Sequence, residues 1–193
     1  TPFIEHFKFS ANSYQLFGQL ITDEDRYPHY ENFWYIWDLF FEKISDLSGI
    51  IDRNRDARET IKYYLFAHPY WNPGTTEGHS IRGKERLFYD RVVNKMGHAS
   101  VVLYSIAKVL NDVGSQFALD GVTWLSNMII ANKYIELESY TIEYIERFIR
   151  RFILMNRQNV KRDNMLKDKV IHILDFLFEN GSIIGFLLRE DIL

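Results

Sequence analysis

Residues 140–178, YTIEYIERFIRRFILMNRQNVKRDNMLKDKVIHILDFLF, carry two apolar stripes with a basic segment between them. In both halves the apolar side chains recur at steps of three and four residues, which places them on one face of an α-helix. The first stripe comprises Ile142, Ile145, Phe148, Ile149, Phe152 and Ile153, and the second comprises Met165, Leu166, Val170, Ile173, Leu174, Leu177 and Phe178. Because neither stripe is stable in water, we predict two helices that join at a short basic hinge and pack on each other or on the preceding helices.

The rest of the chain has the same helical spacing and lacks the alternating β-branched runs that strands need. We predict one or two helices over residues 3–22, then helices over about 30–47, 52–67, 80–96, 99–113 and 121–132, and a short last helix after the pair in 140–178. Asp120 and Ser182 are the expected N-caps of the helices that follow them, and Asn180-Gly181 is the expected stop signal. The predicted fold is all-α, with about eight helices in a multi-helix bundle or a short HEAT-like stack.

Length and composition favour one globular domain. The chain has 193 residues, 47% apolar and 16% aromatic, so we expect a single all-α domain over residues 1–193. It contains no cysteine, which excludes disulfides and thiolate metal sites and fits the reducing cytoplasm. No apolar run approaches the ~20 residues of a membrane span, so we expect no membrane partner. Because the chain starts at Thr1 rather than methionine, we expect a C-terminal fragment of a longer protein.

Charge is unevenly distributed along this chain, whose net charge is −3. Residues 1–50 hold three basic and eight acidic side chains, whereas residues 147–169 hold eight basic and two acidic ones. The candidate binding residues in the basic segment are Arg150, Arg151, Arg157, Lys161 and Arg162. Such a patch can bind phosphates, or it can be a solvated helix surface whose cations are favoured by the dipole of a helix C-terminus. Since the whole chain is acidic, nucleic acid is the less favoured partner.

One clear loop interrupts the helical pattern at residues 68–78, HPYWNPGTTEG. Two prolines and two glycines exclude a regular helix there. Tyr70 and Trp71 are candidate binding residues, because loops held by rigid helices often bind partners. Trp71 could equally fill the core and fix the loop, because a solvent-exposed tryptophan is costly.

The six histidines predict neither a metal site nor a cofactor site. Helical metal sites need ligands three or four residues apart; His172 with Asp175 has that spacing, but a single pair supplies too few ligands for a metal ion. No phosphate-binding glycine loop or nucleophile elbow is present. Arg91 and His98, separated by six residues, are similar in spacing to the catalytic pair of the HEPN domains, a family of helical ribonucleases. That resemblance implies a nuclease that works as a dimer, but Val92 stands where the family has a polar residue.

The last residues of the chain suggest a second resemblance. Residues 180–193, NGSIIGFLLREDIL, and residues 124–129, WLSNMI, resemble helical C-terminal regions of large bacterial P-loop NTPases. The resemblance covers under a third of the chain and includes no catalytic motif. It implies a HEAT-like domain that serves as a sensor or scaffold for an NTPase domain located elsewhere in a longer protein.

The sequence therefore favours a non-enzymatic helical interaction domain that binds a protein partner through helix faces or through the aromatic loop. Two alternatives remain open at this point. One is a HEPN-like ribonuclease that uses Arg91 and His98. The other is a helical domain that contacts nucleic acid through the basic segment of residues 147–169.

Overall fold

The computed structural model describes residues 84–113, 118–131 and 137–192. Contacts between Cα atoms divide the chain into two compact units, residues 1–76 and Glu77–Leu193, and every described residue belongs to the second. The helices expected before residue 84 and the loop containing Tyr70 and Trp71 lie outside the described residues. The single domain expected over residues 1–193 spans both units and stays a prediction.

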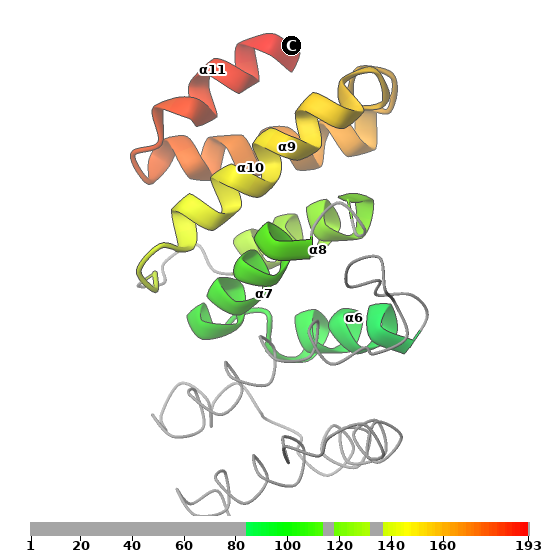
Figure 1. Cartoon of the computed structure of the whole chain (residues 1–193), viewed down its shortest axis with the longest axis vertical. Helices are drawn as coiled ribbons and strands as arrows, with labels where there is room; N and C mark the ends of the chain where they lie inside the picture. The colour runs from blue at the N-terminus through cyan, green and yellow to red at the C-terminus, as the bar shows by residue number, and fades with distance from the viewer. Residues whose placement is uncertain (1–83, 114–117, 132–136, 193) are drawn as a thin grey trace, which may run out of the picture. The chain divides into compact units, whose positions relative to one another are not determined.

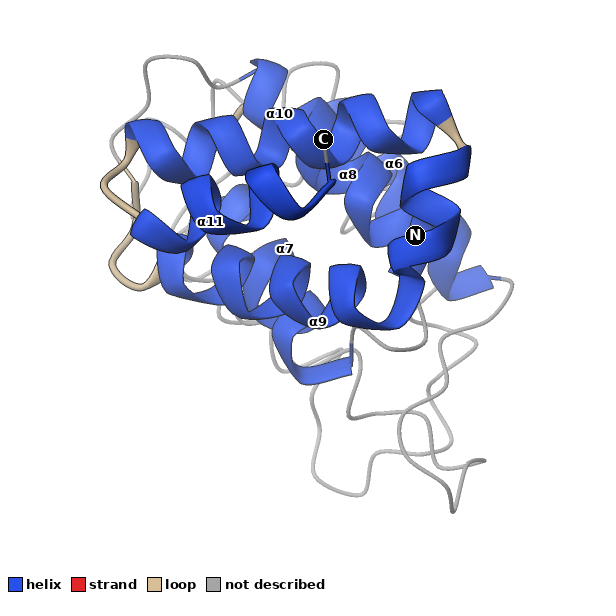
Figure 2. Ribbon diagram, turned by 90° about the horizontal axis from the view of Figure 1, so that it is seen from above, coloured by secondary structure: helices blue, strands red, loops and turns tan. Residues whose placement is uncertain are grey.

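The described part of the chain is all-helical, as predicted (Figures 1 and 2). Its helices are α6 (Lys84–Met96), α7 (Ser100–Val113), α8 (Ala118–Ala131), α9 (Thr141–Arg162), α10 (Asn164–Glu179) and α11 (Ile183–Ile192). No strand occurs among the described residues. None of these six helices combines the length and the apolar character needed to cross a membrane.

Each described helix packs on the helix that follows it and on the one after that. Thus α7 contacts both α8 and α9, and α9 contacts both α10 and α11. Figure 1 shows α6, then α7 with α8, then α9 with α10, and then α11 in successive levels. Within this unit, α7, α9 and α11 therefore adjoin in one series, and α6, α8 and α10 adjoin in another.

The predicted apolar stripe of α9 is buried apart from its first member. Ile145, Phe148, Ile149, Phe152 and Ile153 are buried, and Ile142 is half-buried. The stripe of α10 was predicted less well, because Met165 and Phe178 at its two ends are 73% and 57% exposed. Met165 belongs to the first turn of α10 and Phe178 to its last turn, where the Phe178 ring lies 6.0 Å from the ring of Phe186 on α11 but stays largely exposed. The middle of the α10 stripe, from Leu166 to Leu177, is buried as predicted.

The predicted basic hinge between the two helices is wrong. Helix α9 continues through Arg162, and Asp163 alone separates it from α10, where its carboxylate accepts a hydrogen bond from the Leu166 amide at 3.1 Å. The helix is interrupted earlier, at Asn156, whose φ of −123° and ψ of 16° are not helical. The Asn156 side-chain amide donates to the Phe152 carbonyl at 3.1 Å. The cations expected in a hinge are therefore held on a kinked helix.

The helix ends confirm the signals at residues 180–182 and correct the one at residue 120. Gly181 has a φ of +87°, and the amides of Gly181 and Ser182 donate to the carbonyls of Phe178 and Leu177, the pattern of a Schellman motif. Ser182 precedes α11, and its hydroxyl accepts from the Gly185 amide at 3.4 Å. Helix α8, in contrast, begins at Ala118, so Asp120 lies inside its first turn rather than at its N-cap.

Candidate functional site

Helix α9 presents a strongly basic surface. Every charged residue that is exposed on it is a cation, and these residues, called the basic face below, are Arg147, Arg150, Arg151, Arg157, Lys161 and Arg162. The two glutamates of α9, Glu143 and Glu146, are half-buried. The sequence sets this arrangement, because the buried stripe and the cations alternate along the helix with complementary helical spacing. The basic candidates predicted from the sequence therefore lie together on one element.

Both glutamates of α9 are engaged within the protein. Glu143 forms an ion pair with Arg147, one helical turn away. Glu146 accepts a hydrogen bond at 2.6 Å from the hydroxyl of Ser182, the residue that precedes α11. An external ligand of α9 therefore meets cations, one of which, Arg147, is paired with Glu143.

Arg151 also has a structural contact. Its guanidinium donates to the main-chain carbonyl of Asn111, and the same nitrogen lies 3.3 Å from the Asn111 side-chain oxygen. Asn111 belongs to the last turn of α7, where carbonyl groups lack partners within the helix. Arg151 thus ties α9 to the C-terminal end of α7 while it remains exposed on the basic face.

Two apolar side chains are exposed among these cations. Leu154 and Met155 are each 71% exposed on α9. Single exposed apolar residues are ordinary on protein surfaces. Two adjacent ones within a cationic surface mean that this surface offers both charged and apolar contacts. Neither residue stands out in the sequence, because both follow the apolar stripe directly and are apolar themselves. Leu154 could have been found from its position three and four residues after Arg151 and Arg150. Met155 gives no such signal, because it lies three residues after Phe152 and seven after Phe148.

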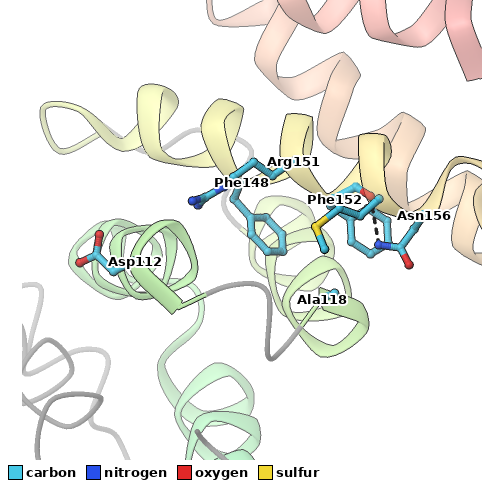
Figure 3. Close-up of a pocket in the computed structure, with 7 residues that line it drawn as sticks. Asp112, Ala118, Phe148, Arg151, Phe152 and Asn156 are labelled. Carbon is cyan, nitrogen blue, oxygen red and sulfur yellow. Dashed lines mark hydrogen bonds between the residues drawn. The ribbon is translucent and has the colours of Figure 1, made fainter. Parts of the chain in front are cut away.

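A small pocket opens beside Met155. It has a volume of about 70 Å³ and is lined by residues of α7, α8 and α9: Asp112, Ala118, Phe148, Arg151, Phe152, Met155 and Asn156. Figure 3 shows the rings of Phe148 and Phe152 side by side below α9, with Ala118 opposite them on α8. The two ring centroids are 6.3 Å apart. The pocket therefore has a mainly apolar lining at the margin of a cationic helix face.

The other site candidates lie apart from this surface. Arg91 is half-buried on α6, and His98 is exposed in the short connection between α6 and α7. Among the described residues, no group of three or more histidines and carboxylates could hold a metal ion. His172 lies with its Nδ1 3.3 Å from the Ser126 hydroxyl, and Asp175 forms an ion pair with Arg189 at 3.0 Å.

The described residues thus form an all-helical unit with a cationic helix face and an adjoining apolar pocket. Neither protein-family models nor curated protein sequences match this chain. The exposed surface of α9 is therefore the main indication of its function.

Proposed function

We propose that this protein is a non-enzymatic helical interaction domain whose basic face binds an acidic segment of a protein partner. One observation supports the proposal above all others: the exposed charges of α9 are six cations, and two exposed apolar side chains, Leu154 and Met155, lie among them. A surface that combines charge with apolar contact suits an amphipathic partner that offers carboxylates and aliphatic groups together.

The order of helix contacts supports a role as a scaffold or sensor. Helices that pack on their next and next-but-one neighbours form short stacks of the HEAT-like kind, in which the surface of a helix series is available for binding. Helix α9 lies between α7 and α11 in such a series. A short helical stack is also what the resemblance to C-terminal regions of P-loop NTPases implies.

A protein partner accounts for this surface better than nucleic acid does. Phosphate backbones need cations but gain little from exposed aliphatic side chains such as Leu154 and Met155. Single-stranded nucleic acids also use aromatic side chains as stacking platforms, and none is exposed on α9.

The proposal can be tested with a fluorescently labelled acidic peptide. A peptide of about 20 residues, with leucines along one helix face and glutamates elsewhere, is long enough to form a helix when bound. In fluorescence-anisotropy titrations of the full chain, we expect binding that weakens as the salt concentration rises from about 0.05 M to about 0.3 M, since salt screens exposed charges. A peptide of the same pattern with lysine in place of glutamate should not bind.

Lys161 and Lys95 form a matched pair for this experiment. Both lysines are exposed, and each lies in the last turn of its helix, so reversal to glutamate costs the same interaction with a helix dipole. We expect Lys161→Glu to weaken peptide binding several-fold and Lys95→Glu on α6 to leave it unchanged. Equal effects of the two substitutions, or no binding of the acidic peptide to the parent protein, would contradict the proposal.

A further inference from the structure

The pocket between α7, α8 and α9 adds a specific feature to the cationic surface. Two of its lining residues, Arg151 and Met155, are exposed residues of α9, so the pocket opens at the surface where an acidic segment would lie. Its inner wall consists of Phe148 and Phe152, which also belong to the buried stripe of α9. A ligand that follows α9 can therefore reach the edge of the core at this point.

The polar groups of the pocket already have partners within the protein. Arg151 donates to the Asn111 carbonyl, and the Asn156 amide donates to the Phe152 carbonyl. Asp112 accepts hydrogen bonds from Lys108 at 3.4 Å and from Asn111 at 3.1 Å. A polar group placed against the rings of Phe148 and Phe152 would lose its water and gain no hydrogen bond from them, which is costly, so the inner part of the pocket favours an apolar occupant.

The size of the pocket limits the occupant further. Sites for cofactors and drug-sized ligands usually have volumes of about 300–1,000 Å³, far more than the roughly 70 Å³ found here. One water-sized group needs about 10–15 Å³ on this scale, so the pocket holds about five such groups. That capacity corresponds to a single leucine or isoleucine side chain.

We propose that this pocket receives one aliphatic side chain of an acidic helix that lies along α9. The inference rests on the proposed function, since the same acidic partner is required, and it defines the sequence pattern of that partner. Charge complementarity sets the rest of the pattern. Arg147 and Arg150 lie about one turn before the pocket residues Arg151 and Met155, and Lys161 and Arg162 lie beyond the kink at Asn156.

The partner should therefore carry a leucine or isoleucine with acidic residues about one turn away on one side and about two turns away on the other. The anchor position itself should be apolar, because Phe148 and Phe152 form the inner wall of the pocket. An acid there would lie near Asp112 as well as near Arg151, and it would lose hydration against the two rings.

The test compares two labelled acidic peptides that differ only at one central position, leucine in one and alanine in the other. On the parent protein, we expect the leucine peptide to bind about tenfold or more tightly than the alanine peptide, as burial of one aliphatic side chain predicts. Ala118→Leu, which fills the pocket from α8, should remove most of this difference. Ala131→Leu is the matched control, since Ala131 ends the same helix and does not line the pocket.

Met155→Lys provides a second variant in case Ala118→Leu disturbs folding. Met155 is 71% exposed, so its replacement leaves the core intact. The substitution adds a cation and removes an apolar pocket wall, so a purely electrostatic surface would bind both peptides more tightly. The pocket proposal instead predicts that the preference for leucine falls.

The outcomes separate the two proposals. If both peptides bind with the expected salt dependence but with equal affinity, the pocket proposal is wrong and the proposed function stands. A leucine preference that survives both Ala118→Leu and Met155→Lys also contradicts the pocket proposal. If neither peptide binds the folded parent protein, the proposed function fails and the pocket proposal fails with it.

Discussion

Arg151 on α9 donates a hydrogen bond to the main-chain carbonyl of Asn111 in the last turn of α7. The carbonyl is one of the last four of α7, which have no partner inside the helix. A guanidinium at this position also interacts favourably with the negative end of the α7 dipole. One residue of the basic face therefore stabilises the packing of two helices beside the pocket that it lines.

Arg151→Ala should lower the free energy of unfolding by about 0.5–1 kcal/mol, a value reduced from that of a buried charged hydrogen bond because Arg151 is exposed. Arg150→Ala is the matched control, with the same change at the neighbouring exposed position, and should stay within about 0.5 kcal/mol of the parent. Urea denaturation of both variants measures the difference. Equal stability of the two would show that the contact with Asn111 does not stabilise the fold.

Leu174 and Met165 provide a test of which part of the α10 stripe is core. Leu174 is fully buried, so Leu174→Ala should cost about 2–5 kcal/mol by leaving a cavity, and Phe148→Ala on α9 should cost a similar amount. Met165→Ala should cost less than about 0.5 kcal/mol, because its side chain is 73% exposed. Thermal or urea denaturation measures these values. A Leu174→Ala protein as stable as the parent would mean that α10 does not pack as described.

The same residues explain how far the sequence could predict this fold. Apolar spacing identified the helices and the buried middle of each stripe, because burial and helical period impose the same pattern on the chain. It failed at Met165 and Phe178, in the first and last turns of α10, because apolar spacing does not say how far along a helix burial extends. The hinge was misplaced because the helix continues through the cations from Arg157 to Arg162 and is interrupted at Asn156, which the apolar pattern does not reveal.

The candidate site was predicted only in part. The cations of residues 150–162 lie at exposed positions of one helix, and their role in binding stays a prediction. The contact between Arg151 and Asn111 joins residues far apart in the chain and depends on the packing of α9 against α7. The pocket depends on the same packing and on the start of α8 at Ala118, three residues earlier than predicted.

Gly185 should be required for the close contact between α11 and α10. A Cβ atom at this position would lie 2.7 Å from the Leu174 carbonyl oxygen and 3.0 Å from the Phe178 amide nitrogen. Because both atoms belong to the α10 backbone, Gly185→Ala should force the helices apart. We expect a net loss of about 1–3 kcal/mol despite the better helix propensity of alanine.

Gly181 is the control that separates steric overlap from backbone strain. Its φ of +87° disfavours other residues, but a Cβ atom there would meet no atom within 4 Å. Gly181→Ala should therefore cost about 1 kcal/mol, and Gly181→Asn should cost less because asparagine adopts left-handed conformations more readily. If Gly185→Asn were likewise less harmful than Gly185→Ala, the steric explanation for Gly185 would be wrong. Urea denaturation provides all four values.

His98 tests the ribonuclease alternative. We expect His98→Ala and Arg91→Ala to leave the behaviour of the protein toward RNA unchanged, because the surface of α9 accounts for binding without catalysis. The measurement is the fate of a labelled single-stranded RNA incubated with purified parent protein and with each variant. Degradation by the parent protein that is lost in both variants would establish the HEPN-like alternative in place of the interaction domain.

The last prediction concerns nucleic acid and the basic face. We expect no electrophoretic shift of duplex DNA or of single-stranded RNA at about 0.15 M salt, where the Debye length is about 8 Å. If the cations did contact duplex phosphates, each neutralised phosphate would add about 0.9 to the slope of log affinity against log salt. Reversal of Arg157, Lys161 and Arg162 to glutamate would then abolish the shift in a folded protein. The acidic-peptide experiment probes the same face. If nucleic acid is shifted with this salt dependence, the shift is lost in the triple variant, and the acidic peptide does not bind, then the partner of the basic face is a nucleic acid and not a protein.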